Sequence, residues 1–271
     1  MDVAKLTMSP NAEFRLGLIG AGRLGQAIAR TWSARTGEGL LVWSRSGPHP
    51  TTETRISYGT WVAEWTKVLE ARSIVIAITG KPLLELAEDS DEAKQFKGNV
   101  FSAAASLSQE SLRRVFPQAT IVCIAPFLIT DINSIPMLVL RPSDHPASQW
   151  EQAKAELDNF GDIDVVENEE IFADMSLLGA PWAAVVMAAL EAAARAGVQR
   201  LQDEAAIGMG RRLFFRGLQS LLTTHAEQNA AGEIVTPGGI TERGLKSLGD
   251  LTSPFESVFN QMRARADELR A

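Results

Sequence analysis

The stretch Leu16-Gly17-Leu18-Ile19-Gly20-Ala21-Gly22-Arg23-Leu24-Gly25 joins an apolar run to a glycine-rich turn and then to a helical pattern. A strand, a G-x-G-x-x-G turn and a helix in this order predict the start of a βαβ unit that binds a dinucleotide. Gly20 permits a tight turn, Gly22 lets the backbone approach a pyrophosphate, and Gly25 lets the helix pack closely on the strand. The alternative is a glycine-rich turn without a ligand, but a second apolar run at residues 40–43 favours the complete unit.

The end of that second run, Val42-Trp43-Ser44-Arg45-Ser46, carries no carboxylate. An NAD site would place an acidic side chain there to hold the ribose 2′-hydroxyl. An arginine flanked by two hydroxyls suits a 2′-phosphate instead, because a guanidinium binds phosphate oxygens with two parallel hydrogen bonds. A solvated surface arginine is the alternative. The sequence favours NADPH as the cofactor, and the expected contacts are Gly20, Ala21, Gly22, Arg23, Leu24, Gly25, Ser44, Arg45, Ser46, Thr79 and Lys81.

The two halves of the chain differ in pattern. Residues 1–168 alternate between strand-like runs and helical patterns, which predicts an α/β fold with a mostly parallel, doubly wound Rossmann sheet. The strands are expected at residues 15–19, 40–43, 73–78, 99–103, 120–124, 137–140 and 162–166. The helices between them are expected at residues 24–34, 61–71, 83–94, 109–116 and 148–160. Residues 169–271 lose the strands and predict an all-helical second domain, with helices within 169–231, 241–248 and 254–269.

Composition limits the classes of function. The net charge of −7 argues against a nucleic-acid partner, which would require a basic face. A single cysteine, Cys123, excludes an internal disulfide, and three well-separated histidines form no metal-ligand spacing, so no metal is expected. The most apolar segment, residues 177–194, is rich in alanine and contains Glu191. We expect it to be a buried helix of a cytoplasmic protein that does not interact with a membrane.

Three stretches together resemble one known family. The glycine-rich stretch, the strand end at Trp43-Ser44-Arg45-Ser46 and the late turn Val235-Thr236-Pro237-Gly238-Gly239-Ile240-Thr241 are similar in order and spacing to pyrroline-5-carboxylate reductases. Ser102-Ala103-Ala104-Ala105 and Gly179-Ala180-Pro181-Trp182-Ala183 resemble further stretches of that family. The resemblance implies reduction of the C=N bond of a small cyclic imino acid by NADPH, as in proline biosynthesis. It also implies a homodimer formed through the helical domain.

The same resemblance assigns roles to the late turn. It implies that Thr236, Pro237, Gly238 and Gly239 bind the substrate carboxylate and that Thr241 is the catalytic residue beside the imine nitrogen. The chemistry of the turn agrees, because two glycines expose backbone N–H groups and a helix that begins near Thr241 adds its positive end. The alternative is an ordinary turn followed by a helix cap.

One stretch departs from the family. After its fifth strand the family usually has Met-Pro-Asn-Thr-Pro, whereas this chain has Ile124-Ala125-Pro126-Phe127-Leu128-Ile129, with apolar residues on the nicotinamide side. Two alternatives therefore remain: a reductase of the same fold with a different imine or ketone substrate, and a non-catalytic NADPH-binding protein. A basic cluster at Arg211, Arg212 and Arg216 is expected to be a solvated face or a subunit contact.

Overall fold

The computed structural model describes residues 14–47, 59–105, 107–127, 134–142, 146–224 and 252–270, and residues 240, 243 and 247. The chain divides into two compact units. The first contains residues 1–180 and 263–271, and the second contains residues 181–262. Helix α6 (Glu169–Leu178) lies in the first unit, although it follows the expected end of the sheet domain at residue 168.

The first unit is built on one sheet, which has eight strands in the described part of the chain and the order β3-β2-β1-β4-β5-β6-β7-β8. The neighbouring strands are parallel except for the antiparallel pair β6 and β7. The strands are β1 (Leu16–Ile19), β2 (Leu40–Trp43), β3 (Gly59–Trp61), β4 (Ser73–Ile76), β5 (Asn99–Ser102), β6 (Thr120–Pro126), β7 (Met137–Leu140) and β8 (Ile163–Val166). The expected α/β class with a mostly parallel sheet is confirmed.

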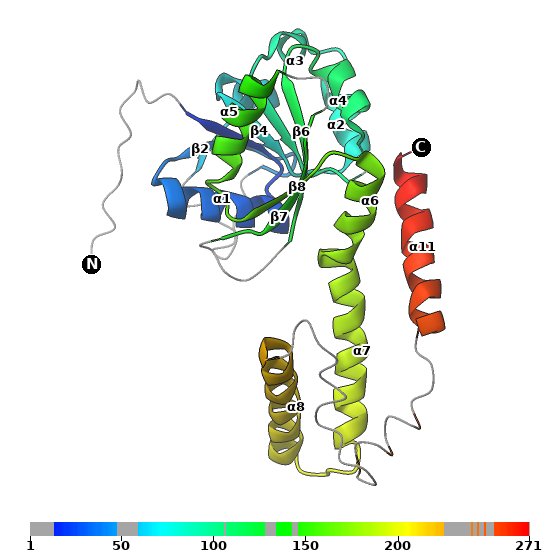
Figure 1. Ribbon diagram of the computed structural model, residues 1–271. Helices are drawn as coiled ribbons and strands as arrows, with labels where there is room; N and C mark the ends of the chain where they lie inside the picture. The colour runs from blue at the N-terminus through cyan, green and yellow to red at the C-terminus, as the bar shows by residue number, and fades with distance from the viewer. Residues whose placement is uncertain are drawn as a thin grey trace, which may run out of the picture. The chain divides into compact units, whose positions relative to one another are not determined.

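Helices cover both faces of this sheet (Figure 1). On one face α1 (Arg23–Thr36) and α5 (Ala147–Leu157) bury Trp32, Ile28 and Trp150 against the strands. The other face is covered by the 3₁₀ helix η2 (Trp65–Glu70), α2 (Gly80–Ala87), α3 (Asp91–Gln95), α4 (Gln109–Val115) and α6. Because both faces are buried, the central strands are near-continuous apolar runs, which is why they are recognisable in the sequence.

Two expected elements of this unit are wrong. The helix expected at 61–71 begins four residues later as η2, because residues up to Trp61 form the short edge strand β3. The helix expected at 83–94 is two helices. The first ends at Ala87, and the hydroxyl of Ser90 accepts a hydrogen bond from the N–H of Ala93 at 3.2 Å, which caps α3. The other expected helices match α1, α4 and α5 to within a few residues.

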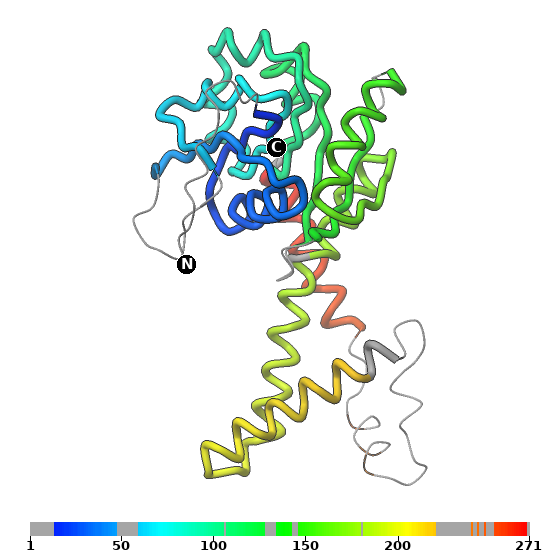
Figure 2. Tube along the Cα trace, turned by 90° about the vertical axis from the view of Figure 1, so that its left-hand side faces the viewer, coloured from blue at the N-terminus to red at the C-terminus, as the bar shows by residue number. Residues whose placement is uncertain are grey.

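The second unit is helical in its described part. It contains nearly all of α7 (Ala180–Val198), all of α8 (Glu204–Thr224) and the first half of α11 (Thr252–Arg270). Figure 2 traces α7 and α8 as two long helices joined by a short connection. Near that connection a Cβ atom at Gly210 would meet the side chain of Val198 at 2.7 Å, so a small residue is needed there. The ring of Trp182 packs edge-on against Phe255 and Phe259, at centroid distances of 5.7 and 5.4 Å.

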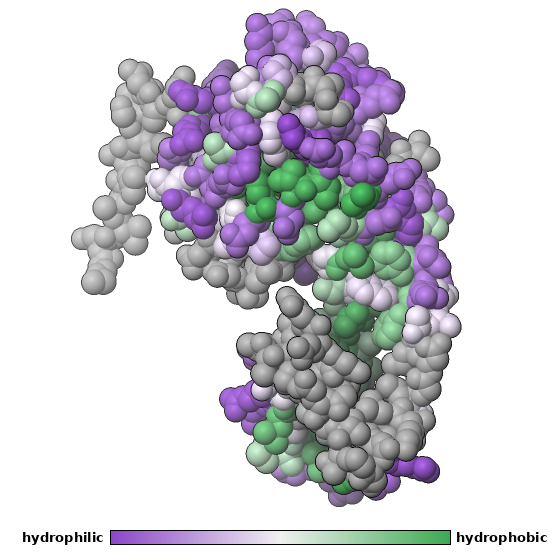
Figure 3. Space-filling view, in the orientation of Figure 1, coloured by the Kyte–Doolittle hydropathy of each residue, from purple (hydrophilic) through white to green (hydrophobic). Residues whose placement is uncertain are grey.

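The apolar helix is not buried in the single chain. The stretch Glu169–Val198 is long and apolar enough to cross a membrane, and only 6% of its most apolar 18-residue segment is buried. Met187, for example, is 45% exposed, and Figure 3 shows apolar surface along the upper part of α7. The expectation of a buried helix at 177–194 is therefore wrong for the isolated chain. Length and composition alone are weak evidence for a membrane span, because core helices of soluble proteins can be equally long and apolar.

Candidate functional site

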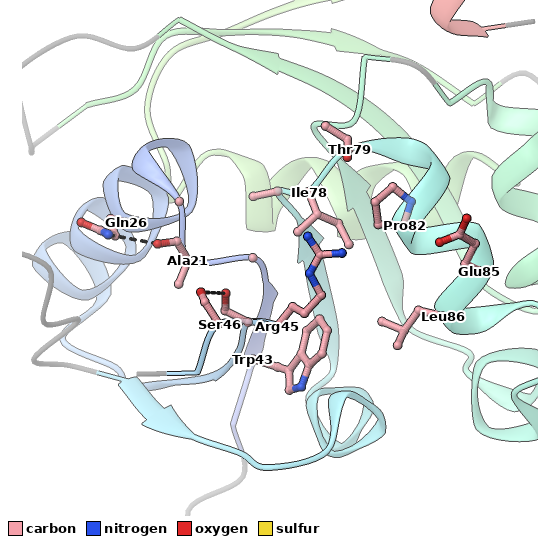
Figure 4. Close-up of a pocket in the computed structure, with 14 residues that line it drawn as sticks. Ala21, Gln26, Trp43, Arg45, Ser46, Ile78, Thr79, Pro82, Glu85 and Leu86 are labelled. Atoms are coloured by element: carbon pink, nitrogen blue, oxygen red, sulfur yellow. Dashed lines mark hydrogen bonds between the residues drawn. The ribbon is translucent and has the colours of Figure 1, made fainter. Parts of the chain in front are cut away.

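A pocket of about 730 Å³ opens at the carboxyl ends of β1, β2 and β4. In the sheet, β2 lies next to β1 on one side and β4 lies next to β1 on the other. The pocket is therefore at the point where the strand order reverses. Such a switch point is the usual ligand site of an open α/β sheet. Three segments line most of the pocket: the glycine-rich turn after β1, the turn after β2, and the start of α2 after β4 (Figure 4).

The glycine-rich turn is held close to both neighbouring strands. Gly20 has a φ of 107°, which side chains with a Cβ rarely adopt, and its N–H donates to the carbonyl of Trp43 at 2.8 Å. A Cβ atom at Gly20 would also meet Ile78 at 2.5 Å. The first glycine of the motif is therefore required by both the backbone conformation and the approach of β4.

The other two glycines match their expected roles. A Cβ atom at Gly25 would overlap the carbonyl oxygen of Gly20, so only glycine allows α1 to pack this closely on the turn. At Gly22 a Cβ atom would meet nothing within 4 Å, and the residue is exposed. The backbone beside Gly22 is thus open to the pocket, as the approach of a pyrophosphate requires.

Two helices begin at the pocket without a side-chain cap. The N-cap residue of α1 is Gly22, which has no side chain, and that of α2 is Thr79, whose hydroxyl accepts no hydrogen bond from the helix. In contrast, Ser90, Ser108 and Asn168 cap α3, α4 and α6 with their side chains. Neither α1 nor α2 has an acidic residue in its first turn. The first N–H groups of α1 can therefore bind an anion, with the positive end of the helix dipole behind them.

A tight turn after β2 presents the expected phosphate-binding side chains. The N–H of Gly47 donates to the carbonyl of Ser44 at 2.9 Å, and the hydroxyls of Ser44 and Ser46 lie 3.2 Å apart. Arg45 is exposed and extends between Trp43 and Ile78 in Figure 4. Within the described part of the chain its guanidinium has no hydrogen bond or ion pair, so its donors are free for a ligand.

The structure brings most of the expected cofactor contacts together. Seven of them line the pocket, namely Gly20, Ala21, Gly22, Ser44, Arg45, Ser46 and Thr79. Arg23, Leu24, Gly25 and Lys81 do not. Lys81 is 87% exposed and lies 3.9 Å from Glu85, the geometry of a solvated surface pair.

Sequence reasoning missed several lining residues. Trp43, Ala77, Ile78, Pro82 and Leu86 give the pocket apolar walls, and Gln26 and Glu85 add polar groups. The residues of α2 had one detectable signal, because a helix that follows β4 directly has to begin at the same edge of the sheet. Among the described residues no group of histidine, cysteine and carboxylate side chains has the arrangement of a metal site.

The expected substrate contacts lie outside the described residues. These are Thr236, Pro237, Gly238, Gly239 and Thr241. The departing stretch is described as far as Phe127, whose N–H donates to the carbonyl of Pro136 at 2.8 Å. A Cβ atom at Gly179 would overlap the ring of Phe127, so this ring lies directly on the Gly179 backbone.

The basic cluster on α8 forms a second, open pocket. Arg211, Arg212 and Arg216 line it together with Phe215 and Gln219. All three arginines are exposed on a single helix, as expected for a solvated face or a subunit contact.

Comparisons with known proteins were made for sequence and for structure. No family model matches the chain. A pyrroline-5-carboxylate reductase of Aquifex aeolicus is 27% identical over 244 residues, which cover 86% of this chain and 88% of that protein.

Solved structures share the fold at lower identity. Pyrroline carboxylate reductase of Plasmodium falciparum with NADP bound has a TM-score of 0.76 and 16% identity, and the match covers 95% of this chain and 98% of that one. The Coxiella burnetii pyrroline-5-carboxylate reductase has a TM-score of 0.74 and 18% identity, with 96% and 100% covered. An imine reductase of Myxococcus stipitatus in complex with NADP+ is less similar, with a TM-score of 0.53, 16% identity and 93% of each chain covered. The chain therefore has the fold of the pyrroline-5-carboxylate reductases and resembles them in sequence along most of its length, as its motifs predict.

Proposed function

We propose that this chain is an NADPH-dependent reductase of the C=N bond of a small cyclic imino acid, acting as a pyrroline-5-carboxylate reductase in proline biosynthesis. The observation that carries the proposal is the pocket at the switch point, in which the end of β2 offers Arg45 and no carboxylate. Similarity to reductases over most of the chain supports the reaction.

The pocket residues fit an NADP molecule. The open side of Gly22 and the start of α1, which has no side-chain cap, suit a pyrophosphate. Ser44, Arg45 and Ser46 suit the 2′-phosphate, and the apolar side chains between them suit the adenine ring. When bound, the reduced nicotinamide supplies the hydride.

The protein's own task is then to bind and orient. We propose that Gly238 and Gly239 hold the substrate carboxylate through their backbone N–H groups and that Thr236 and Pro237 shape this turn. Thr241 would donate a hydrogen bond to the nitrogen. An iminium is already a strong electrophile, so correct placement contributes more than a strong acid would.

We also propose that the protein is a cytoplasmic homodimer. A single cysteine in 271 residues is typical of proteins from reducing compartments, where disulfides are rare. The exposed apolar surface of α7 supports a subunit interface, because soluble proteins seldom leave a large apolar patch uncovered.

A second candidate function rests on Phe127. An apolar ring stands at the carboxyl end of β6, where the resemblance implies a polar side chain. This observation favours a reductase of a different imine or ketone. A non-catalytic NADPH-binding protein is the third possibility, because the same change removes polar groups from the presumed nicotinamide side.

An assay of substrates separates these functions. We expect NADPH oxidation with pyrroline-5-carboxylate, measured at 340 nm beside a panel of other cyclic imines and ketones. Turnover of another imine or ketone alone would select the second function. Tight NADPH binding without turnover of any panel member would select the third.

Arg45→Asp tests the cofactor site. A charge-assisted contact to phosphate contributes about 1.5–3 kcal/mol, so NADPH binding should weaken about tenfold to a hundredfold while NADH binding changes little. Both affinities follow from fluorescence titration. Lys97→Asp, which makes the same charge change at an exposed residue outside the pocket, should leave both affinities unchanged. Equal losses of affinity for the two cofactors in Arg45→Asp would show that Arg45 does not bind the 2′-phosphate.

Thr241→Ala and Thr241→Val test the catalytic assignment. Each should lower turnover about tenfold to a thousandfold if the hydroxyl acts mainly in the transition state. NADPH affinity should not change, because the pocket is built from other segments. Thr241→Ser keeps the hydroxyl and should retain most of the activity. Wild-type turnover rates in both the alanine and valine variants would contradict the catalytic role and leave Thr241 only the role of a helix cap.

The proposed homodimer is tested by its mass in solution. Sedimentation at micromolar concentration should give about twice the 29.3 kDa of one chain, because α7 then has a partner surface. A stable, folded monomer under these conditions would contradict the proposed interface.

A further inference from the structure

Gln26 contacts the glycine-rich turn with both its backbone and its side chain. Its N–H donates to the carbonyl of Gly22 at 2.9 Å, and its side-chain Nε2 donates to the carbonyl of Ala21 at 3.0 Å. One residue therefore binds two successive carbonyl oxygens of the turn. In Figure 4 the Ala21 carbonyl points toward Gln26 and away from Arg45 and Ile78.

The side-chain bond fixes the direction of one peptide group. In a trans peptide the C=O and the following N–H point in opposite directions. With the Ala21 oxygen turned to Gln26, the N–H of Gly22 is turned away from it, and this N–H has no partner among the described residues. A flip of the Ala21–Gly22 peptide would reverse both groups and place a carbonyl oxygen where an anion is expected.

Glycine makes such a flip easy. Gly22 has no Cβ, and even an added Cβ would meet nothing within 4 Å, so no side chain at this position opposes the alternative peptide orientation. The openness that admits a pyrophosphate thus also leaves the turn free to reorient. A separate interaction has to select the orientation that presents the N–H.

The position of Gln26 in the helix suits this task. Glutamine or glutamate at the third residue of a helix commonly accepts a hydrogen bond from the N-cap N–H and so uses up that donor. In α1 the third residue is Gly25, and Gln26 is the fourth. Its amide donates to the carbonyl before the N-cap and does not use the N–H of Gly22.

We propose that Gln26 is a positioning residue that holds the Ala21–Gly22 peptide in the orientation that binds the pyrophosphate. The inference rests on the proposed dinucleotide site but not on the substrate. Gln26 acts through the backbone it orients, so its effect is confined to ligands that carry a pyrophosphate. The adenosine 2′-phosphate end of the pocket, built from the turn after β2, does not depend on it.

The test compares two ligands in Gln26→Met, which keeps the length of the side chain and removes the donor. One hydrogen bond changes an equilibrium about threefold to tenfold, so the Kd of NADPH should rise by that factor. The inhibition constant of adenosine 2′-phosphate, measured by displacement of NADPH, should change by less than about twofold. Gln26→Glu should weaken NADPH more than Gln26→Met, because a carboxylate repels both the Ala21 carbonyl and the pyrophosphate.

A matched control removes an equivalent bond elsewhere. The side-chain Nε2 of Gln118 donates to the carbonyl of Lys94, also at 3.0 Å, outside the pocket. Gln118→Met should leave both ligand affinities at the wild-type value, and thermal unfolding reports whether each variant is folded.

The outcomes are distinct. Loss of NADPH affinity with retained adenosine 2′-phosphate affinity supports the proposal. Equal losses for both ligands in Gln26→Met indicate a structural role alone and overturn it, as does wild-type affinity for both. Wild-type protein that binds NADPH but reduces no imine would refute the proposed reaction and leave the role of Gln26 standing. Wild-type protein that does not bind NADPH would refute both.

Discussion

The close contact between the backbone of Gly25 and the carbonyl of Gly20 is the constraint on which the site depends. It places the first turn of α1 directly at the exit of β1, because no side chain separates helix and strand. The same approach brings Gly20 within hydrogen-bonding distance of β2 and within contact of Ile78 beyond β4. Three strand ends therefore converge on one glycine, and the pocket is the space left beside them. A larger residue at either glycine would separate the elements that form the pocket walls.

The electrostatic character of the pocket depends on which side chains are absent from its described lining as much as on those that are present. The helices that begin there lack side-chain caps and first-turn carboxylates, whereas three others in the same unit have a capping side chain. A cap contributes about 1 kcal/mol of stability, so its omission at α1 has a cost that the pyrophosphate of the proposed cofactor would offset. Arg45 can likewise bind a ligand, since its guanidinium stays unpaired within the described part of the chain. Among the described lining residues Glu85 is the one acidic side chain, and it lies near Lys81.

The parts that the sequence predicted are those with strong local signals. Strands such as β1 and β4 are buried on both faces, so each appears as a short apolar run between polar segments. Edge strand β3 was missed because three residues with one side to solvent give too short a pattern. The break before α3 was missed because residues 88–92 also fit the polar face of one helix, although the Ser90 hydroxyl and the carboxylates of Asp91 and Glu92 mark a new start. Gln26 was missed because its place in the pocket lining depends on tertiary packing, which no local pattern encodes.

The apolar stretch after β6 shows how far local packing can determine chemistry. The ring of Phe127 rests on the backbone of Gly179, and this contact is possible only because Gly179 has no side chain. A glycine there can serve close packing of an aromatic ring as well as the approach of a ligand, so the glycine by itself does not identify a substrate site. The polarity of this end of the sheet is instead decided by the residue that fills the space, and here that residue is aromatic. In the proposed reaction, an aromatic wall beside the C=N bond would exclude water and strengthen the remaining polar contacts, at the cost of hydrogen bonds that would orient the substrate. Orientation then has to come from backbone donors, which is the role proposed for the glycine turn at residues 236–239.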